Sequence, residues 1–218
     1  LALDITGEVI EEAIEQHAQL IISHHPLIFR PIKRLDASDM VSRTIMKAVR
    51  NGIAIYSAHT NLDNSIPGVS SHMASVLGLQ NVKALGVDAA GRMSGVIGEL
   101  AEPMDEISFL KLVKTCFEVP CVRHNAQLDR QIKSVALCGG SGAFLAYDAC
   151  RMGADAFVTG EIGYHRFFGF DGVMKLVEIG HFESEQYTLD LIMDLLRGEF
   201  PGLRVEKTGV KVNPINYM

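Results

Sequence analysis

The sequence has neither a long apolar run nor a run of basic residues, and these two absences exclude whole classes of protein. A membrane-spanning helix needs roughly 20 consecutive apolar residues, and no stretch approaches that length. The formal net charge is −6 and no segment is rich in Lys and Arg, so there is no electrostatic footprint for DNA, RNA or an anionic membrane. We therefore expect neither a membrane nor a nucleic acid as its partner.

Cysteine is also scarce, and the four residues present, Cys116, Cys121, Cys138 and Cys150, show no CxxC spacing and follow no secretory leader. Reduced thiols in a cytoplasmic protein are the simplest account of this pattern. The glycine-rich stretch 138–142, CGGSG, lacks the Lys-Ser/Thr of a P-loop and the spacing of a dinucleotide fingerprint. Two readings of it stay open: a phosphate cradle made by backbone N–H groups, or a tight turn.

What the chain does contain is a short apolar run that ends in two adjacent histidines. Residues 20–23, LIIS, are too few and too β-branched for a helix and favour a buried parallel strand. Pro26 cannot donate to a β ladder, so the strand should end near Ser23 and place His24 and His25 at its carboxyl end. Ligands of open α/β sheets collect beyond those ends. The pair therefore predicts the edge of a functional site.

An internal repeat organises the whole chain. Three strand-like segments separated by helical patterns, at 1–4, 20–23 and 53–59, match three others at 135–138, 156–159 and 175–181. The match predicts an α/β fold in which duplicated β-α-β-α-β units form two related lobes with a metal site between them. We expect one domain over 1–218, with pseudo-repeats at about 1–92 and 131–218, a middle elaboration at 93–130 and a last strand over 203–212.

Histidine and carboxylate residues follow the strand ends of both repeats. Five of them make up the predicted ligand set: His24, His25, Asp63, His181 and Glu185. Three imidazoles and two carboxylates suit borderline divalent ions such as Zn, Fe, Mn or Ni. Five ligands are too many for one tetrahedral ion with an open position, and they suit two ions roughly 3.5 to 4 Å apart with one bridging carboxylate. Glu185 lies four residues after His181, so we expect both on one helix face and Glu185 in the bridging role.

Each ligand candidate also has a simpler explanation. An adjacent histidine pair is often a loop coincidence, Asp63 would cap a turn, and Glu185 would favour a helix N-terminus through the dipole. These explanations are credible one at a time. Together they do not explain why polar residues follow all of these strand ends, and we therefore favour the metal site.

Five further polar residues near the strand ends are weaker candidates: His59, Thr60, Asn61, Glu161 and His165. The two histidines and the glutamate would act as catalytic acid–base groups, as partners that fix imidazole tautomers, or as ordinary polar lining, and we favour the tautomer-fixing role. Thr60 and Asn61 would hydrogen-bond the substrate or form a turn.

Several of these stretches together resemble the NIF-three-like family, whose members are often labelled GTP cyclohydrolase 1 type 2. The matching stretches are SHHPLIF (23–29), AHTNLD (58–63), the GG turn (139–140), GADAFVTGEIGYH (153–165) and GHFESE (180–185). The resemblance implies a duplicated α/β fold, a dinuclear metal centre between its lobes, and toroidal homohexamers built from dimers. The chain looks like the short form of the family, because the larger inserted domain of some members is missing here. It also departs from the family's usual pattern, in which a segment with a Trp- or Phe-Asp-Asn motif precedes the first strand.

The resemblance also implies which residue holds which ion. By motif match, His25 and Asp63 would hold one ion, and His24 and His181 the other. Glu185 would bridge the two.

The resemblance describes the metal site better than the reaction. Our leading hypothesis is a hydrolase that depends on divalent metal ions and acts on a small molecule, with the paired ions activating water. If the family label holds, the substrate is GTP, attacked at C8 of the guanine ring; another nucleotide or a phosphoester would use the same groups. The competing hypothesis is a metal-binding regulatory or scaffold protein that turns nothing over. An open coordination position beside a nucleotide-sized pocket would favour the enzyme.

Overall fold

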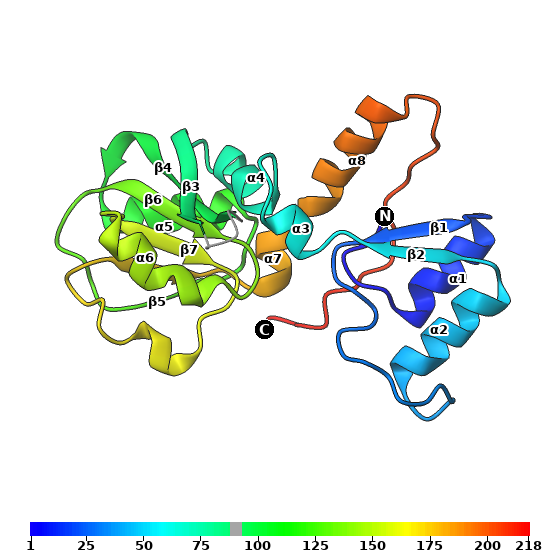
Figure 1. Cartoon of the computed structure of the whole chain (residues 1–218). Helices are drawn as coiled ribbons and strands as arrows, with labels where there is room; N and C mark the ends of the chain where they lie inside the picture. The colour runs from blue at the N-terminus through cyan, green and yellow to red at the C-terminus, as the bar shows by residue number, and fades with distance from the viewer. Residues whose placement is uncertain (88–92) are drawn as a thin grey trace. The chain divides into compact units, whose positions relative to one another are not determined.

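The structure, a computed structural model, describes residues 1–87 and 93–218. The chain forms two compact units (Figure 1). The first unit comprises residues 1–61 and 188–218, and the second comprises residues 62–187. The repeat boundary that the sequence predicts at residue 92 lies outside the described residues.

In the first unit, two parallel strands carry two helices on one side. Strands β1 (Leu20–Ser23) and β2 (Ala54–Ser57) pair in parallel register. Helices α1 (Gly7–Glu15) and α2 (Met40–Arg50) lie together on one side of these strands (Figure 1). Apolar side chains between the strands and helices form the core of this unit, among them Val9, Ile10, Ile21, Ala48 and Ile53.

The predicted strand over residues 1–4 is reduced to a single parallel bridge between Ala2 and Ser23. The backbone N–H groups of His24 and His25 nevertheless donate to the carbonyl oxygens of Ala2 and Leu3, at 3.2 and 2.9 Å. The N-terminal segment is too short for a regular strand, but it fixes the backbone of the histidine pair.

Two more helices and the C-terminal tail contribute residues to the first unit. Helix α3 (Thr60–Asp63) follows β2 and spans the sequence boundary between the units, and α8 (Thr188–Glu199) begins the returning segment. The sequence predicts a strand over residues 203–212, and this prediction is wrong, because the tail has no regular secondary structure. Val210 and Val212 pack against the core of the first unit instead. Packing rather than a β ladder therefore explains the apolar residues of the tail.

The second unit is built on a six-stranded mixed sheet. Its strands are β3 (Gln80–Val87), β4 (Met93–Met104), β5 (Arg123–His124), β6 (Ile132–Cys138), β7 (Ala156–Thr159) and β8 (Lys175–Glu178). They lie in the order β3-β4-β6-β7-β8-β5, with β6, β7 and β8 parallel and the remaining pairs antiparallel. Because β4 and β5 come from residues 93–130, this middle segment extends the sheet and forms no body of its own.

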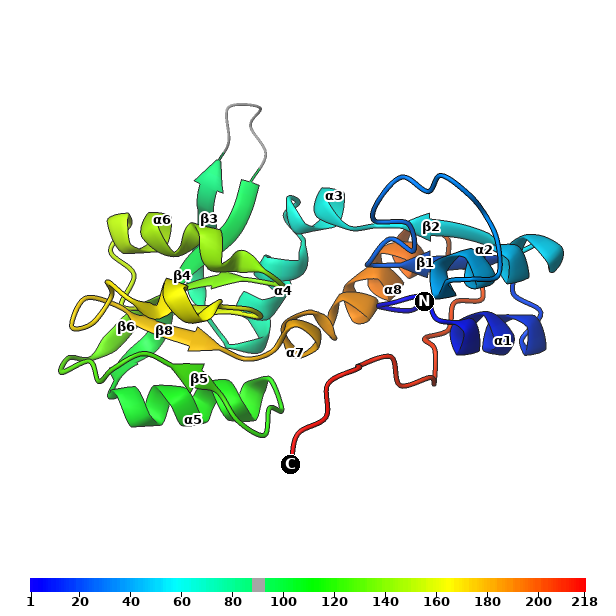
Figure 2. The same cartoon turned by 90° about the horizontal axis from the view of Figure 1, so that it is seen from below.

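Helices cover both faces of this sheet. Leu137 on β6 belongs to the core under α4 (Val69–Val76) and α5 (Glu106–Cys116), whereas its neighbour Ala136 belongs to the core under α6 (Ala146–Arg151). Figure 2 shows α5 and α6 on opposite sides of the strands. Successive side chains of a strand point to opposite faces, so a strand covered on both sides reads as a continuous apolar run.

Short helices follow the parallel strands of the second unit. The 3-10 helix η1 (Gly142–Leu145) and α6 join β6 to β7, a second 3-10 helix, η2 (Tyr164–Phe167), follows β7, and α7 (His181–Glu185) follows β8. Three extended segments in parallel and in chain order thus occur in each unit: the Ala2 bridge with β1 and β2, and β6 with β7 and β8. The predicted α/β class is confirmed.

The helices of both units are short. The longest helix that the structure describes, α8, has 12 residues. Within residues 1–87 and 93–218, no helix combines the length and the apolar character that crossing a bilayer requires.

Candidate metal centre

Three imidazoles gather at the carboxyl ends of β1 and β2 in the first unit. His24 and His25 directly follow β1, and His59 follows β2. One ring nitrogen from each of the three lies within 4.8 Å of the others, so they form a group that could hold a metal ion. Their ring centroids are 5.0 to 5.6 Å apart. We refer to His24, His25 and His59 as the imidazole cluster.

Hydrogen bonds orient two of these rings. His24 is fully buried, and its Nδ1–H donates to the Ala58 carbonyl oxygen at 2.8 Å. His25 is also buried, and its Nδ1–H donates to Asp4 Oδ1 at 2.9 Å. In a neutral imidazole whose Nδ1 carries the proton, Nε2 carries the lone pair that binds a metal ion. Both rings are therefore held in the tautomer that a metal site needs.

The local sequence explains why the histidine pair lies at this place. The hydroxyl of Ser23 donates to the His25 carbonyl oxygen at 2.7 Å and lies 2.9 Å from Ser57 Oγ. Pro26, with no N–H group, cannot continue the ladder. The strand therefore ends at Ser23, as the sequence predicts, and the next two side chains project from its carboxyl end.

In the second unit, one imidazole lies between two carboxylates. His181 Nδ1–H donates to Glu161 Oε1 at 3.0 Å, and His181 Nε2 lies 3.1 Å from Glu185 Oε2. His181 and Glu185 are four residues apart on α7, the spacing that puts both on one helix face. Glu185 is buried, with 4% of its surface exposed. We refer to Glu161, His181 and Glu185 as the carboxylate cluster.

The charges of the carboxylate cluster act on one another. The hydrogen bond to Glu185 raises the pKa of His181 against the lowering effect of burial, and the charges of Glu185 and Glu161 add to the rise. A hydrogen bond from the Ser141 hydroxyl lowers the pKa of Glu161, and the charge of His181 lowers it further. Since two carboxylates stand against one imidazole, the cluster carries an excess of negative charge that favours a cation.

Asp63 and Glu185 both act on the thiol of Cys138 at the end of β6. Burial raises the pKa of Cys138 to about 12, and the charges of Asp63 and Glu185 contribute to the rise. A thiol with this pKa stays protonated at neutral pH and is unreactive. The second unit therefore brings two of the predicted carboxylate ligands close to one buried group.

The glycine turn between β6 and η1 packs against α7. A Cβ atom at Gly140 would collide with Glu185 Oε1, and Gly140 has φ +58°, a conformation that other residues rarely adopt. The Gly140 N–H donates to Ser184 Oγ at 2.9 Å, and the Gly142 N–H donates to Thr159 Oγ1 at 3.0 Å. Of the two readings of this glycine-rich stretch, the structure supports the tight turn, because these N–H groups have partners within the fold.

The remaining predicted site residues lie on exposed segments. Thr60 and Asn61 are exposed residues at the start of α3. His165 is exposed on η2, where its ring centroid lies 5.1 Å from that of Tyr164 and 6.4 Å from that of Phe168. In the part of the chain that the structure describes, no hydrogen bond joins His165 to either cluster. The roles assigned to Thr60, Asn61 and His165 stay predictions.

Sequence reasoning missed two residues that orient others. Asp4 accepts the hydrogen bond from His25, and Ser141 donates one to Glu161. A signal for Asp4 exists in the sequence, because Asp4 ends the first segment of the repeat, where polar residues are expected. Ser141 has no comparable signal, since its contact depends on a turn that brings it to Glu161.

The donor set of the two clusters fits divalent metal ions. Imidazole nitrogens combined with carboxylate oxygens are the ligands of borderline ions such as Zn, Fe, Mn and Ni. His24, His25 and His181 are each held through Nδ1 by an oxygen acceptor, which is the usual arrangement around metal-binding histidines. The structure therefore contains groups of residues that could bind metal.

The chain matches known proteins along nearly its whole length. A family model described as Duf34/NIF3 (NGG1p interacting factor 3) matches residues 1–214. A Clostridium perfringens protein named GTP cyclohydrolase 1 type 2 homolog is 34% identical over 188 residues, covering 85% of this chain and 72% of that protein. Protein NIF3 homolog of Schizosaccharomyces pombe is 30% identical over 228 residues, covering 99% of this chain and 79% of that protein. The crystal structure of Staphylococcus aureus protein SA1388 matches with a TM-score of 0.89 and 28% identity, covering 100% of this chain and 86% of that one.

Proposed function

The chain belongs to the Duf34/NIF3 family, and from this premise we propose that it is a hydrolase that depends on divalent metal ions and acts on a nucleotide. The orientation of three imidazoles carries the proposal. His24 and His25 each donate Nδ1–H to an oxygen of the protein, which leaves Nε2 as the ligand atom. His181 donates Nδ1–H to Glu161 and presents Nε2 to Glu185.

We propose that His24 and His25 of the imidazole cluster and His181 and Glu185 of the carboxylate cluster bind two divalent ions together with Asp63. In this arrangement His25 and Asp63 would hold one ion, His24 and His181 would hold the other, and Glu185 would bridge them. The proposal is supported by the complementary chemistry of the clusters, since one supplies imidazole nitrogens and the other adds carboxylate oxygens. When bound, such a pair of ions lowers the pKa of water and polarises the electrophilic atom of a substrate.

The protein's own residues position these ligands and move protons. Glu161 accepts hydrogen bonds from His181 and Ser141 on its two oxygens, so we assign it a positioning role. His59 is only partly buried within the imidazole cluster, which suits a group that exchanges protons with a substrate. We assign proton transfer to His59, with His165 as the second candidate.

The substrate is proposed from the relatives and from exposed polar groups. Several relatives carry the name GTP cyclohydrolase 1 type 2 homolog, which makes GTP the first substrate to test. Hydrolysis at C8 of guanine opens the five-membered ring and releases that carbon as formate. Thr60 and Asn61 are exposed and supply a hydroxyl and an amide for hydrogen bonds to such a substrate.

The test is to load the purified protein with Mn or Zn and to measure its metal content together with formate release from GTP and hydrolysis of a nucleotide panel. We expect two ions per chain and a turnover that a chelator abolishes and added metal restores. Metal-loaded protein that hydrolyses no member of the panel would favour a regulatory or scaffold protein. Protein that retains no metal after dialysis would contradict the proposed site itself.

We also propose a cytoplasmic homohexamer. The family resemblance supports the hexamer, and the four cysteines, which are all free thiols, support a reducing compartment. Light scattering on the metal-loaded protein would measure its mass. The mass of a single chain would contradict the assembly.

A further inference from the structure

The loop between β1 and α2 differs in charge from the chain as a whole. Residues 28–35, IFRPIKRL, are all exposed, have no regular secondary structure and include three cations, Arg30, Lys33 and Arg34. No acidic residue lies among them, although the chain carries a net charge of −6. We refer to residues 28–35 as the arm.

Phe29 connects the arm to the imidazole cluster. Its side chain is 66% exposed, yet its ring centroid lies 6.3 Å from that of His25 and 5.7 Å from that of His59. The contact with His59 is edge-to-face, with an interplanar angle of 79°. An aromatic ring that both contacts a candidate metal site and faces water offers a flat apolar surface that a bound ligand would cover.

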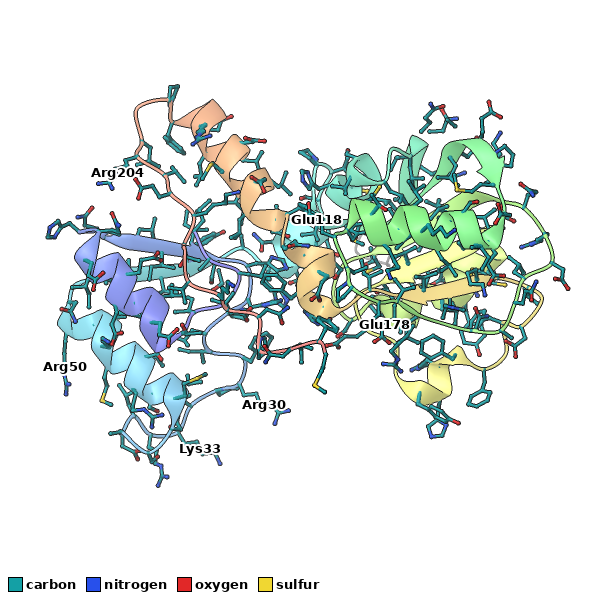
Figure 3. The ribbon with its side chains drawn as sticks, turned by 180° about the vertical axis from the view of Figure 1, so that it is seen from behind. Arg30, Lys33, Arg50, Glu118, Glu178 and Arg204 are labelled. Atoms are coloured by element: carbon teal, nitrogen blue, oxygen red, sulfur yellow. The ribbon has the colours of Figure 1, made fainter. Side chains whose placement is uncertain are left out.

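Two cations of the arm have no counter-charge among the residues that the structure describes. Arg34 pairs with Asp36 at 3.0 Å. Arg30 and Lys33, by contrast, form no ion pair or hydrogen bond with any residue that the structure describes, and their side chains extend away from the ribbon (Figure 3). Guanidinium and ammonium groups without an internal partner are suited to bind phosphate oxygens.

The backbone of the arm is restricted before any ligand binds. Pro26 precedes the arm and Pro31 lies within it, and no glycine occurs between residues 24 and 38. Each proline holds φ near −65° and reduces the conformations open to the loop. A restricted loop loses less entropy on binding, so its side chains contribute more of their contact energy to affinity.

We propose that the arm recognises the substrate of this site: Phe29 stacks on a planar base, and Arg30 and Lys33 bind the phosphate oxygens of a nucleotide. The inference rests on the proposed function, because it assigns a substrate class to the same metal site. It commits to a ligand with both a base and phosphates, because the arm presents an aromatic ring and two unpaired cations within five residues.

Isothermal titration calorimetry on the metal-loaded full chain separates the two contacts. The ligands are GTP, guanosine and inorganic triphosphate, and the variants are Phe29→Leu and the double variant Arg30→Gln/Lys33→Gln. We expect Phe29→Leu to weaken GTP and guanosine about tenfold and to leave triphosphate unchanged. The double variant should weaken GTP and triphosphate about tenfold and leave guanosine unchanged.

Arg50→Gln is the matched control. Arg50 is an exposed cation of the same unit and the last residue of α2, just before β2 begins, so it lies at the end of the strands opposite the imidazoles (Figure 3). Its variant should bind all three ligands like the unmodified protein. Metal content is measured before and after each titration, and it should be equal in all the proteins.

Three outcomes would overturn the inference. One is wild-type affinity for all three ligands in both arm variants, and another is unmodified protein that holds metal yet binds none of the ligands. The third is a change in assembly mass in the arm variants with unchanged nucleotide affinity, which would make the arm a subunit contact. Failure of the proposed function would be seen separately, as lost metal binding or lost turnover in the unmodified protein.

Discussion

The imidazole cluster of the first unit and the carboxylate cluster of the second stand on similar strand ends but differ in charge. In the first unit, the carboxylate of Asp4 accepts a hydrogen bond from one imidazole of the cluster, that of His25. In the second, the single imidazole of His181 lies between Glu161 and Glu185. One cluster is therefore a set of three imidazoles, and the other combines one imidazole with two carboxylates.

The internal repeat explains how this difference arises. When segment 53–59 is matched to 175–181, His59 corresponds to His181 and, at the same offset, Asp63 to Glu185. When segment 20–23 is matched to 156–159, His25 corresponds to Glu161. Both copies keep an imidazole and a carboxylate four residues apart. They differ at both positions after the second segment, where His24 and His25 correspond to Gly160 and Glu161.

Loss of Glu185, the carboxylate that we propose to bridge two ions, should have the largest effect on metal binding. Glu185→Gln removes one charge and the proposed bridging ligand, so we expect both ions to be lost, with affinity more than about 100-fold weaker, beyond the range for partners that only orient ligands. Elemental analysis after dialysis measures this. Glu118→Gln, which changes an exposed glutamate of the same unit (Figure 3), should retain full metal content. Full metal content in Glu185→Gln would count against the bridging role.

The second unit contains a buried ion pair whose contribution to the free energy of unfolding can be measured. Lys175 is fully buried on β8, and its Nζ donates to Glu106 Oε1 at 2.8 Å and to the carbonyl oxygens of Asn125 and Ala126 at 3.1 and 2.7 Å. Lys175→Met leaves the Glu106 carboxylate buried without its partner, so the free energy of unfolding of this unit should fall by about 3–5 kcal/mol. Denaturant unfolding followed by circular dichroism measures the change.

The control for this ion pair is the double variant Lys175→Met/Glu106→Gln, which should recover much of the loss because no buried charge remains. Burial alone would raise the pKa of Glu106, but hydrogen bonds from Lys175 and Leu128 outweigh it and lower the pKa below its ordinary value. A lowered pKa contributes stability that is present above the unfolded pKa and lost as pH falls through the folded one. The gap between Lys175→Met and the unmodified protein should therefore shrink in acid, and a gap independent of pH would contradict this account.

Asp4→Asn and Glu161→Gln compare the two clusters directly. Each variant removes the carboxylate that orients one imidazole, His25 in the first unit and His181 in the second. We expect each to weaken metal binding roughly 10–100-fold, with one of the two ions affected more than the other. Titration with limiting metal, followed by elemental analysis, resolves the two ions. Unchanged affinity in both variants would show that neither carboxylate orients a ligand.

The smallest expected effects come from two helix caps, one in each unit. Asp39 Oδ1 accepts a hydrogen bond from Ser42 N at 2.9 Å before α2, and Asp105 Oδ1 accepts one from Ser108 N at 3.0 Å before α5. Hydrogen bonds from these serines lower the pKa of both caps, so their contribution is present at neutral pH and lost as pH falls through the lowered pKa.

We expect Asp39→Ala to reduce amide protection in α2 only, and Asp105→Ala in α5 only, as measured by hydrogen exchange at neutral pH. Near the folded pKa of each cap, the difference from the unmodified protein should disappear. Loss of protection in α5 after Asp39→Ala would show that the two units do not respond separately.

Much of the fold follows from local patterns of residues. The strands over Leu20–Ser23 and Ala156–Thr159 lie within the predicted bounds, because short apolar runs and the chain-breaking residues after them are local signals. Strand β3 (Gln80–Val87) was not predicted, since its sequence lacks clear alternation and its pairing partner, β4, decides its conformation. The tail over 203–212 has strand-like residues but no pairing partner in the described structure, so it forms no strand.

The sequence by itself determined the α/β class and the residues that stand at the strand ends, because periodicity and chain-breaking residues act over a few positions. Only the tertiary structure decided which carboxylate orients which histidine. Asp4 meets His25 and Glu161 meets His181 across about 20 residues of intervening chain. Such contacts depend on strand order, and no local pattern encodes it.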